Sequence, residues 1–255
     1  MENNTVKQDN RKALPKYLLI MLAAAVFGGV TGFAAGWLGH DGLSEAIVAA
    51  VTHALTAAAP WALLVTSVVS LAVILWLYRG ARGLFAGWDG EDETVMDRAD
   101  EKLNWALLLT STQLVLNLFF FAAAESGDSP LGGLVGVLVF VLSAFLMVFA
   151  QQKIVDLTRR MNPEKQGSVY DLHFKEKWMD SCDEAERKQI GQAAYKAFTV
   201  ANAACPILWV VLLMMGFAFN CNVLLPIFTV CLVWLLLIVS YCLESIRLGR
   251  GKTHV

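Results

Sequence analysis

Charge is scarce in this 255-residue chain: only 16% of its residues are Asp, Glu, Lys or Arg, against about 25% in ordinary soluble domains. Six runs contain none of these four residue types, and they cover residues 17–37, 61–78, 103–124, 131–150, 198–219 and 223–243. A helix that crosses a bilayer needs about 20 apolar residues, and a buried helix of a soluble domain seldom has so many. The sequence therefore predicts an all-α, polytopic membrane bundle of six transmembrane helices.

Cations are absent from three of the connections between these runs. All 20 Lys and Arg residues lie in the N-terminal tail, residues 79–102, residues 151–197 and the C-terminal tail. Because cytoplasmic segments carry the excess of Lys and Arg, this pattern predicts a plasma-membrane protein with both termini cytoplasmic. Residues 79–102 and 151–197 are then cytoplasmic loops. The anionic inner leaflet accounts for their cations, so we do not expect nucleic-acid binding.

Sequence patterns of catalysis, metal binding and redox chemistry are missing as well. The five Cys residues show no paired spacing, and no P-loop, His-Glu-x-x-His or Gly-x-Ser-x-Gly pattern occurs. We therefore expect no enzymatic activity and no cofactor. His40 and His53 stand too far apart, without a fixing motif, to predict a metal site. The apolar runs contain no acidic or basic residue, which argues against an ion-coupled transporter.

Small residues recur at intervals of four within two of the runs. Gly28, Gly32 and Gly36 form one such stripe, and Gly132 with Gly136 begins another. In lipid, glycines at this spacing let helix backbones approach closely. The stripes predict tight helix packing inside the bundle, with a homodimer face as the alternative.

The third run is the most polar of the six. Thr110, Gln113 and Asn117 recur at helical spacing and so share one face. Polar side chains at membrane depth face protein or water rather than lipid. This face predicts either hydrogen bonds between helices or a pocket for a substrate or lipid headgroup.

Residues 43–78 read as one helical pattern that only Pro60 interrupts. A helix of that length would extend over about 54 Å, whereas the hydrocarbon core is about 30 Å thick. We therefore expect a separate interfacial or protruding helix over residues 44–58 and a break or kink near Pro60.

The 151–197 connection is punctuated by Asn162-Pro163 and Gly167-Ser168, which predict the end of one helix and a turn. Asp171 is the expected N-cap of a new helix, with Phe174, Trp178, Cys182 and Ala185 along one side. Thr94 with Asp97, and Ser181 with Glu184, fit the capping-box pattern before the third and fifth runs. Two interpretations remain open: a structural helix that lies on the membrane, or a docking surface for a cytoplasmic partner.

The segment "QQKIVDLTRRMNPEKQGSVYDLHFKEKWMDSCDEAERKQIGQAAYKAF" (151–198), with "WDGEDE" (88–93) upstream, resembles a bacterial family of six-span integral membrane proteins catalogued as a domain of unknown function. The resemblance implies a bacterial plasma membrane and no catalytic residues.

The expected function is that of a non-catalytic sensory or accessory component whose 151–197 loop engages a cytoplasmic protein, either a regulator or an ATPase. The alternative is a permease-like subunit of an ABC-type transporter for a peptide or amphiphile. The candidate docking residues are Arg159, Arg160, Asp171, Phe174 and Trp178.

Overall fold

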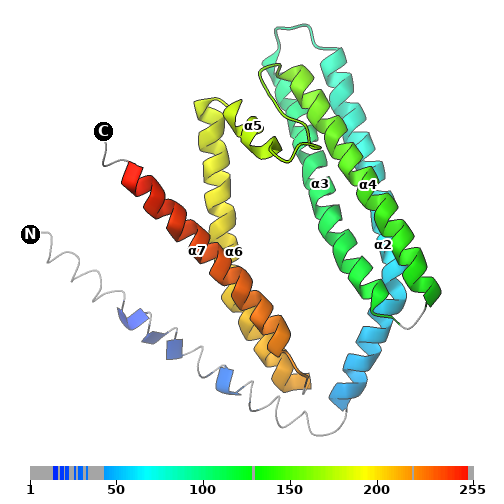
Figure 1. Ribbon diagram of the computed structural model, residues 1–255, viewed down its shortest axis with the longest axis vertical. Coiled ribbons are helices and arrows are strands. Elements are labelled where there is room, and N and C mark those ends of the chain that lie inside the picture. The colour runs from blue at the N-terminus through cyan, green and yellow to red at the C-terminus, as the bar shows by residue number, and fades with distance from the viewer. Residues whose placement is uncertain are drawn as a thin grey trace, which may run out of the picture. The chain divides into compact units, whose positions relative to one another are not determined.

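The computed structural model describes residues 43–127, 130–219 and 221–251, and scattered positions between residues 14 and 33. Within these ranges the chain is helical and forms no strand, as the composition predicts. Figure 1 shows the helices α2 (Leu43–Ala86), α3 (Glu93–Glu125), α4 (Pro130–Met161), α5 (Phe174–Asp180), α6 (Glu184–Phe219) and α7 (Leu224–Gly251).

Five of these helices are long and apolar enough to cross a membrane, namely α2, α3, α4, α6 and α7. Each contains one of the uncharged runs predicted from the sequence, except that α7 begins one residue after its run. Most of the first run, residues 17–37, lies outside the described residues. The described positions within it are helical.

Helix α2 corrects the prediction that residues 44–58 form a separate helix. It continues through Pro60 and contains 44 residues, which corresponds to about 66 Å. Proline removes only one backbone hydrogen bond from a helix, and Ala57, Ala58 and Ala59 before it are strong helix formers. A break of the helix near Pro60 is therefore wrong, and the alternative of a kink at Pro60 stays a prediction.

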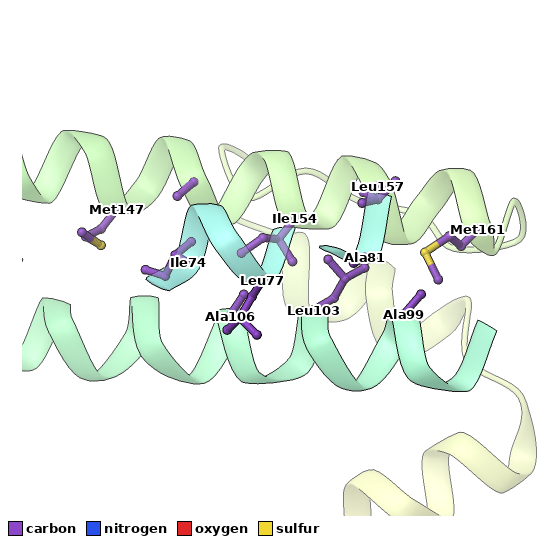
Figure 2. Close-up of a cluster of buried hydrophobic side chains, with 11 residues drawn as sticks. Ile74, Leu77, Ala81, Ala99, Leu103, Ala106, Met147, Ile154, Leu157 and Met161 are labelled. Carbon is purple, nitrogen blue, oxygen red and sulfur yellow. The ribbon is translucent and has the colours of Figure 1, made fainter. Parts of the chain in front are cut away.

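The chain divides into two units, of which one comprises residues 50–191. In this unit α2, α3 and α4 pack as a three-helix bundle around a continuous apolar core. Figure 2 shows this core from Met147 and Ile74 at one end to Met161 and Ala99 at the other. We call the end of the bundle at Met161 and Ala99 the charged end, because its connections carry the Lys and Arg residues.

The other unit comprises residues 1–49 and 192–255. Here α7 folds back along α6 as an antiparallel hairpin. Trp234 Nε1 donates to Asn202 Oδ1 over 2.7 Å, and the rings of Phe198 and Tyr241 stack with centroids 4.5 Å apart. Most of the remaining side chains of this hairpin are exposed and apolar, which suits helices that face lipid.

The helix starts differ from the predicted capping boxes. Asp92, not Thr94, precedes α3, and its Oδ1 accepts the Thr94 N–H at 2.9 Å. At α6 the reciprocal pair is Asp183 with Glu186, each accepting the other's backbone N–H. Both segments offer several acids and hydroxyls within a few residues, so the pattern alone did not determine which would cap.

Candidate functional site

A cluster of polar side chains lies inside the three-helix bundle. Gln113 Nε2 donates to Asn117 Oδ1 (2.8 Å) and to Ser67 Oγ (3.2 Å), while Gln113 Oε1 accepts from Ser70 Oγ (2.8 Å). Asn117 Nδ2 donates to Ser143 Oγ (2.8 Å), which in turn donates to Ser67 Oγ (2.7 Å). We call these five residues the polar cluster, and they join α2, α3 and α4.

The polar cluster lies in the interior of the bundle, and its side chains are fully hydrogen-bonded. Gln113 and Asn117 are 1% and 0% exposed. In the part of the chain that the structure describes, every buried side-chain nitrogen and oxygen has a partner. None of the five side chains titrates near neutral pH. The cluster can therefore hold three helices together, at about 0.6 kcal/mol for an average hydrogen bond between membrane helices.

The sequence predicted only half of this arrangement. Thr110, Gln113 and Asn117 do share the buried face of α3, but the Thr110 hydroxyl donates to Leu107 O of its own helix at 2.8 Å. The partners Ser67, Ser70 and Ser143 were missed. Their only sequence signal was a hydroxyl within an apolar run, and every one of the six runs contains one.

Of the predicted glycine contacts between helices, the structure shows one at Gly136. Gly32 and Gly36 lie outside the described residues. Around Gly28 a Cβ would meet no other atom within 4 Å, whereas a Cβ on Gly136 would lie 3.1 Å from Ala124 Cβ. Gly136 is buried where α4 meets α3. Gly132, four residues earlier, is half-buried.

A second site is the loop of residues 162–183, which connects α4 to α6 at the charged end. After α4 the loop turns back beside that helix before α5 begins (Figure 1). Gln152 Oε1 accepts both Ser168 Oγ (2.9 Å) and the Val169 N–H (2.8 Å). Arg159 Nε donates to Lys165 O at 3.3 Å. The first half of the loop is thus fixed along α4.

An ion pair fixes the same loop to the start of α6. The ammonium group of Lys165, whose side chain is 5% exposed, donates to the Glu186 carboxylate and lies 3.6 Å from Cys182 Sγ. Burial alone would lower the pKa of Lys165, but the Glu186 carboxylate and Cys182 together outweigh it and hold the pKa above its ordinary value. Asp100 on α3 interacts electrostatically with both members of the pair. A buried lysine without this carboxylate would be strongly destabilising.

The second half of the loop is held by its own turns. The Asp171 carboxylate accepts the Lys177 ammonium group and the His173 N–H, and these bonds hold the pKa of Asp171 below its usual range. Phe174 covers Gly167, where φ is +117° and a Cβ would lie 2.8 Å from the ring. A side chain at Gly167 would therefore strain the backbone and also clash with the Phe174 ring.

Two expectations about α5 are wrong. Asp171 is not its N-cap, since the helix begins at Phe174 after His173. The helix also ends at Asp180, so Cys182 lies in the break before α6 and Ala185 belongs to α6. Ser181 lies at the end of α5. Its hydroxyl donates to Trp178 O, and its Oγ accepts the Gln166 N–H.

The five candidate docking residues have different surroundings. Arg159, Asp171 and Phe174 form contacts within the loop, as described above. Arg160 is exposed, and Trp178 is half-buried beside the Phe174 ring at a centroid distance of 5.5 Å. Met179 is 37% exposed and was not predicted. Among the described residues, no three His, Cys, Asp or Glu side chains gather as a metal site would require.

Residues 11–245 match a family model described as "Protein of unknown function (DUF3169)". The chain belongs to the DUF3169 family. The match includes the polar cluster, the 162–183 loop and the greater part of α7. No curated protein and no solved structure matches this DUF3169 chain.

Proposed function

We propose that the protein is a non-catalytic sensory or accessory component of a bacterial plasma membrane that engages a cytoplasmic protein through its 162–183 loop. In this proposal the chain crosses the membrane six times. The charged end of the bundle and both termini are cytoplasmic, because all 20 Lys and Arg residues lie in the four segments assigned to that side.

The observation that supports a docking role best is the ordered state of the loop. Fixing one residue costs about 1–2 kcal/mol of backbone conformational entropy, and a simple connection between two helices does not require it. Here Gln152, Arg159 and Glu186 hold the loop in place. None of the seven residues of α5 is buried.

The residues on α5 that suit a protein interface are Trp178 and Met179, and Arg160 lies exposed at the end of α4. Trp, Met and Arg are enriched in the buried centres of interfaces, while Lys and Glu are depleted there. We therefore assign the docking role to Trp178 and Met179 rather than to Phe174, which covers Gly167 within the loop.

Affinity purification of the full chain from its native membrane in mild detergent tests this assignment. The double variant Trp178→Ala with Met179→Ala should lose a protein that the unaltered chain recovers. Trp105→Ala is the matched control, since Trp105 is exposed on the apolar part of α3 and should leave recovery unchanged. Equal recovery by all three chains would refute the docking surface.

The identity of the recovered protein distinguishes the two proposed roles. A transcriptional or signalling regulator supports the sensory role. An ATPase supports the alternative of a permease-like subunit for a peptide or amphiphile. The chain has no P-loop of its own.

Cysteine labelling of intact cells tests the orientation. Native Cys182 is a poor reporter because it is buried, so Glu176→Cys on the exposed face of α5 is the better one. A membrane-impermeant maleimide applied outside should label Cys221 but not the cysteine at position 176. Labelling at position 176 in intact cells would reverse the proposed topology.

A further inference from the structure

If α2, α3 and α4 cross the membrane as proposed above, the charged residues show where the membrane boundary lies along the three-helix bundle. The first charged residues beyond the apolar runs are Arg79 on α2, Lys102 on α3 and Lys153 on α4. Their neighbours Leu77, Leu103 and Ile154 belong to one buried cluster and lie in the middle part of the core that Figure 2 shows. The three helices therefore change from uncharged to basic in the same part of the bundle.

Aromatic contacts mark the same part of the bundle. Lys102 Nζ lies 5.4 Å from the ring centroid of Trp76, and Lys153 Nζ lies 5.2 Å from that of Phe149. Trp76 is exposed toward the surroundings of the bundle. Lysines and aromatic residues gather where the hydrocarbon meets the headgroups. The boundary of the bilayer thus lies near Lys153.

The 162–183 loop returns to this boundary from the end of α4. Met161 is nine residues beyond Gln152, which is about 14 Å along a helix. Gln152 Oε1 nevertheless accepts Ser168 Oγ and the Val169 N–H, so residues 168 and 169 lie beside Gln152. Gln152 directly precedes Lys153, and the segment after Val169 is therefore held at the level of the headgroups.

That segment displays two large side chains. Tyr170 is 63% exposed and Leu172 is 100% exposed. The acid between them, Asp171, is directed to Lys177 and to the His173 N–H, so its negative charge is compensated within the loop. An exposed leucine and tyrosine with a neutralised acid suit the boundary between headgroups and acyl chains.

We infer that Tyr170 and Leu172 insert into the phospholipid surface next to the bundle and form a membrane contact of the 162–183 loop. Lys153 would face lipid phosphates at the same height. Phe149, which is 45% exposed on α4, would face the acyl chains just below this level. The contact would fix the distance of α5 from the membrane and leave Trp178 and Met179 to a partner. It rests on the membrane crossings of the proposed function, but not on its partner.

The full chain in vesicles of phosphatidylcholine and phosphatidylglycerol tests the contact without any other protein. Cys221, Cys231 and Cys242, which are not buried, are replaced by Ala, while Cys182 and Cys205 are kept because burial shields them from labelling. Single cysteines then carry an environment-sensitive fluorophore at position 172, at position 164 and at position 138. Glu164 is an exposed control in the same loop, and Leu138 is an exposed apolar residue of α4.

The label at position 172 should emit at shorter wavelength than the label at position 164. Lipids that carry a nitroxide near the headgroup should quench it several-fold more strongly, and aqueous iodide, present on both sides, should quench it less. Equal iodide quenching at positions 172 and 164 would overturn the lipid contact and leave Leu172 to another partner. Failure of lipids that carry a nitroxide deep in the acyl chain to quench position 138 would instead show that α4 does not cross the bilayer.

Discussion

Asn117 Nδ2 donates to Ser143 Oγ across 2.8 Å and so ties α3 to α4 inside an otherwise apolar core. Both residues are buried, and Asn117 also accepts from Gln113 on its own helix and from Ser67 on α2. One amide thus connects three helices. Its removal would take one hydrogen bond each from Gln113, Ser67 and Ser143 in a medium that offers no water to replace it.

Asn117→Leu should lower the stability of the bundle. The variant loses three hydrogen bonds, which at about 0.6 kcal/mol each amounts to about 2 kcal/mol and would shift the thermal unfolding midpoint by several degrees. Asn104→Leu is the control, because Asn104 is exposed on the same helix. Thermal unfolding in detergent, followed by loss of the monodisperse peak, measures both variants. Equal midpoints for the two variants would mean that the cluster contributes nothing net.

Gly136→Leu tests the close approach of α4 to α3. A Cβ already lies 3.1 Å from Ala124 Cβ, so a larger side chain must push the helices apart. Overpacking costs about 1–3 kcal/mol, and the unfolding midpoint should fall accordingly. Gly83→Leu on α2 is the matched control, since no atom lies within 4 Å of a Cβ there. An unaltered midpoint for Gly136→Leu would show that the contact can relax freely.

Gly167→Ala should loosen the 162–183 loop. Both Gly167 (φ +117°) and Gly90 (φ +92°) have the backbone conformation that favours glycine, and an alanine in the left-handed region costs about 1–2 kcal/mol. Only Gly167 would also collide with Phe174. Limited proteolysis should therefore cut the loop faster in Gly167→Ala than it cuts residues 87–92 in Gly90→Ala. Similar protection of both segments would contradict the importance of the Phe174 contact.

Glu186→Gln should make the loop sensitive to pH. In the unaltered chain the pKa of Lys165 is raised, so its stabilising contribution is fully present below about pH 10.5 and is lost only as pH rises through the raised value. Without the carboxylate, burial should dominate and place the pKa of Lys165 below that of the unfolded chain. The loop would then gain stability as the pH rises toward that unfolded value.

Hydrogen exchange of residues 162–183 between about pH 7 and about pH 9, corrected for intrinsic rates, measures this effect. Protection should rise with pH in Glu186→Gln and stay level in the unaltered chain. The amide oxygen introduced at position 186 can still accept the Asp183 N–H, so the helix start is preserved. Glu176→Gln removes an exposed charge on α5 and should behave like the unaltered chain. If protection in Glu186→Gln falls as the pH rises, the conclusion that burial lowers the pKa of Lys165 once the carboxylate is removed would be contradicted.

The sequence was sufficient for the parts of the fold that depend on local composition. Uncharged runs predicted the helices, because a bilayer demands about 20 apolar residues whatever their order. The spacing of Thr110, Gln113 and Asn117 predicted one buried polar face, because helical periodicity is local. Pro60 does not end α2, because the effect of one proline on a helix is offset by the strong helix formers around it.

Contacts between distant residues could not be predicted in this way. Lys165 and Glu186 are 21 residues apart, and no local pattern joins them. Ser67 and Ser143 resemble other hydroxyl residues within the apolar runs until the neighbouring helices are known. The loop returns to α4 because the side-chain amide of Gln152 accepts its hydrogen bonds. In the sequence this glutamine only marks the polar end of an apolar run, so the contact could not be predicted.

The apolar core of the bundle extends past the membrane boundary as far as Ala81 and Ala99, which are both 0% exposed. Residues 87–92 therefore join two helices whose ends are already packed together. A rigid two-helix domain could replace these residues so that its helices continue α2 and α3. Its orientation relative to the bundle would then be fixed. For electron microscopy such a fusion would give a small membrane protein an alignment marker, and the 162–183 loop would be left untouched on α4.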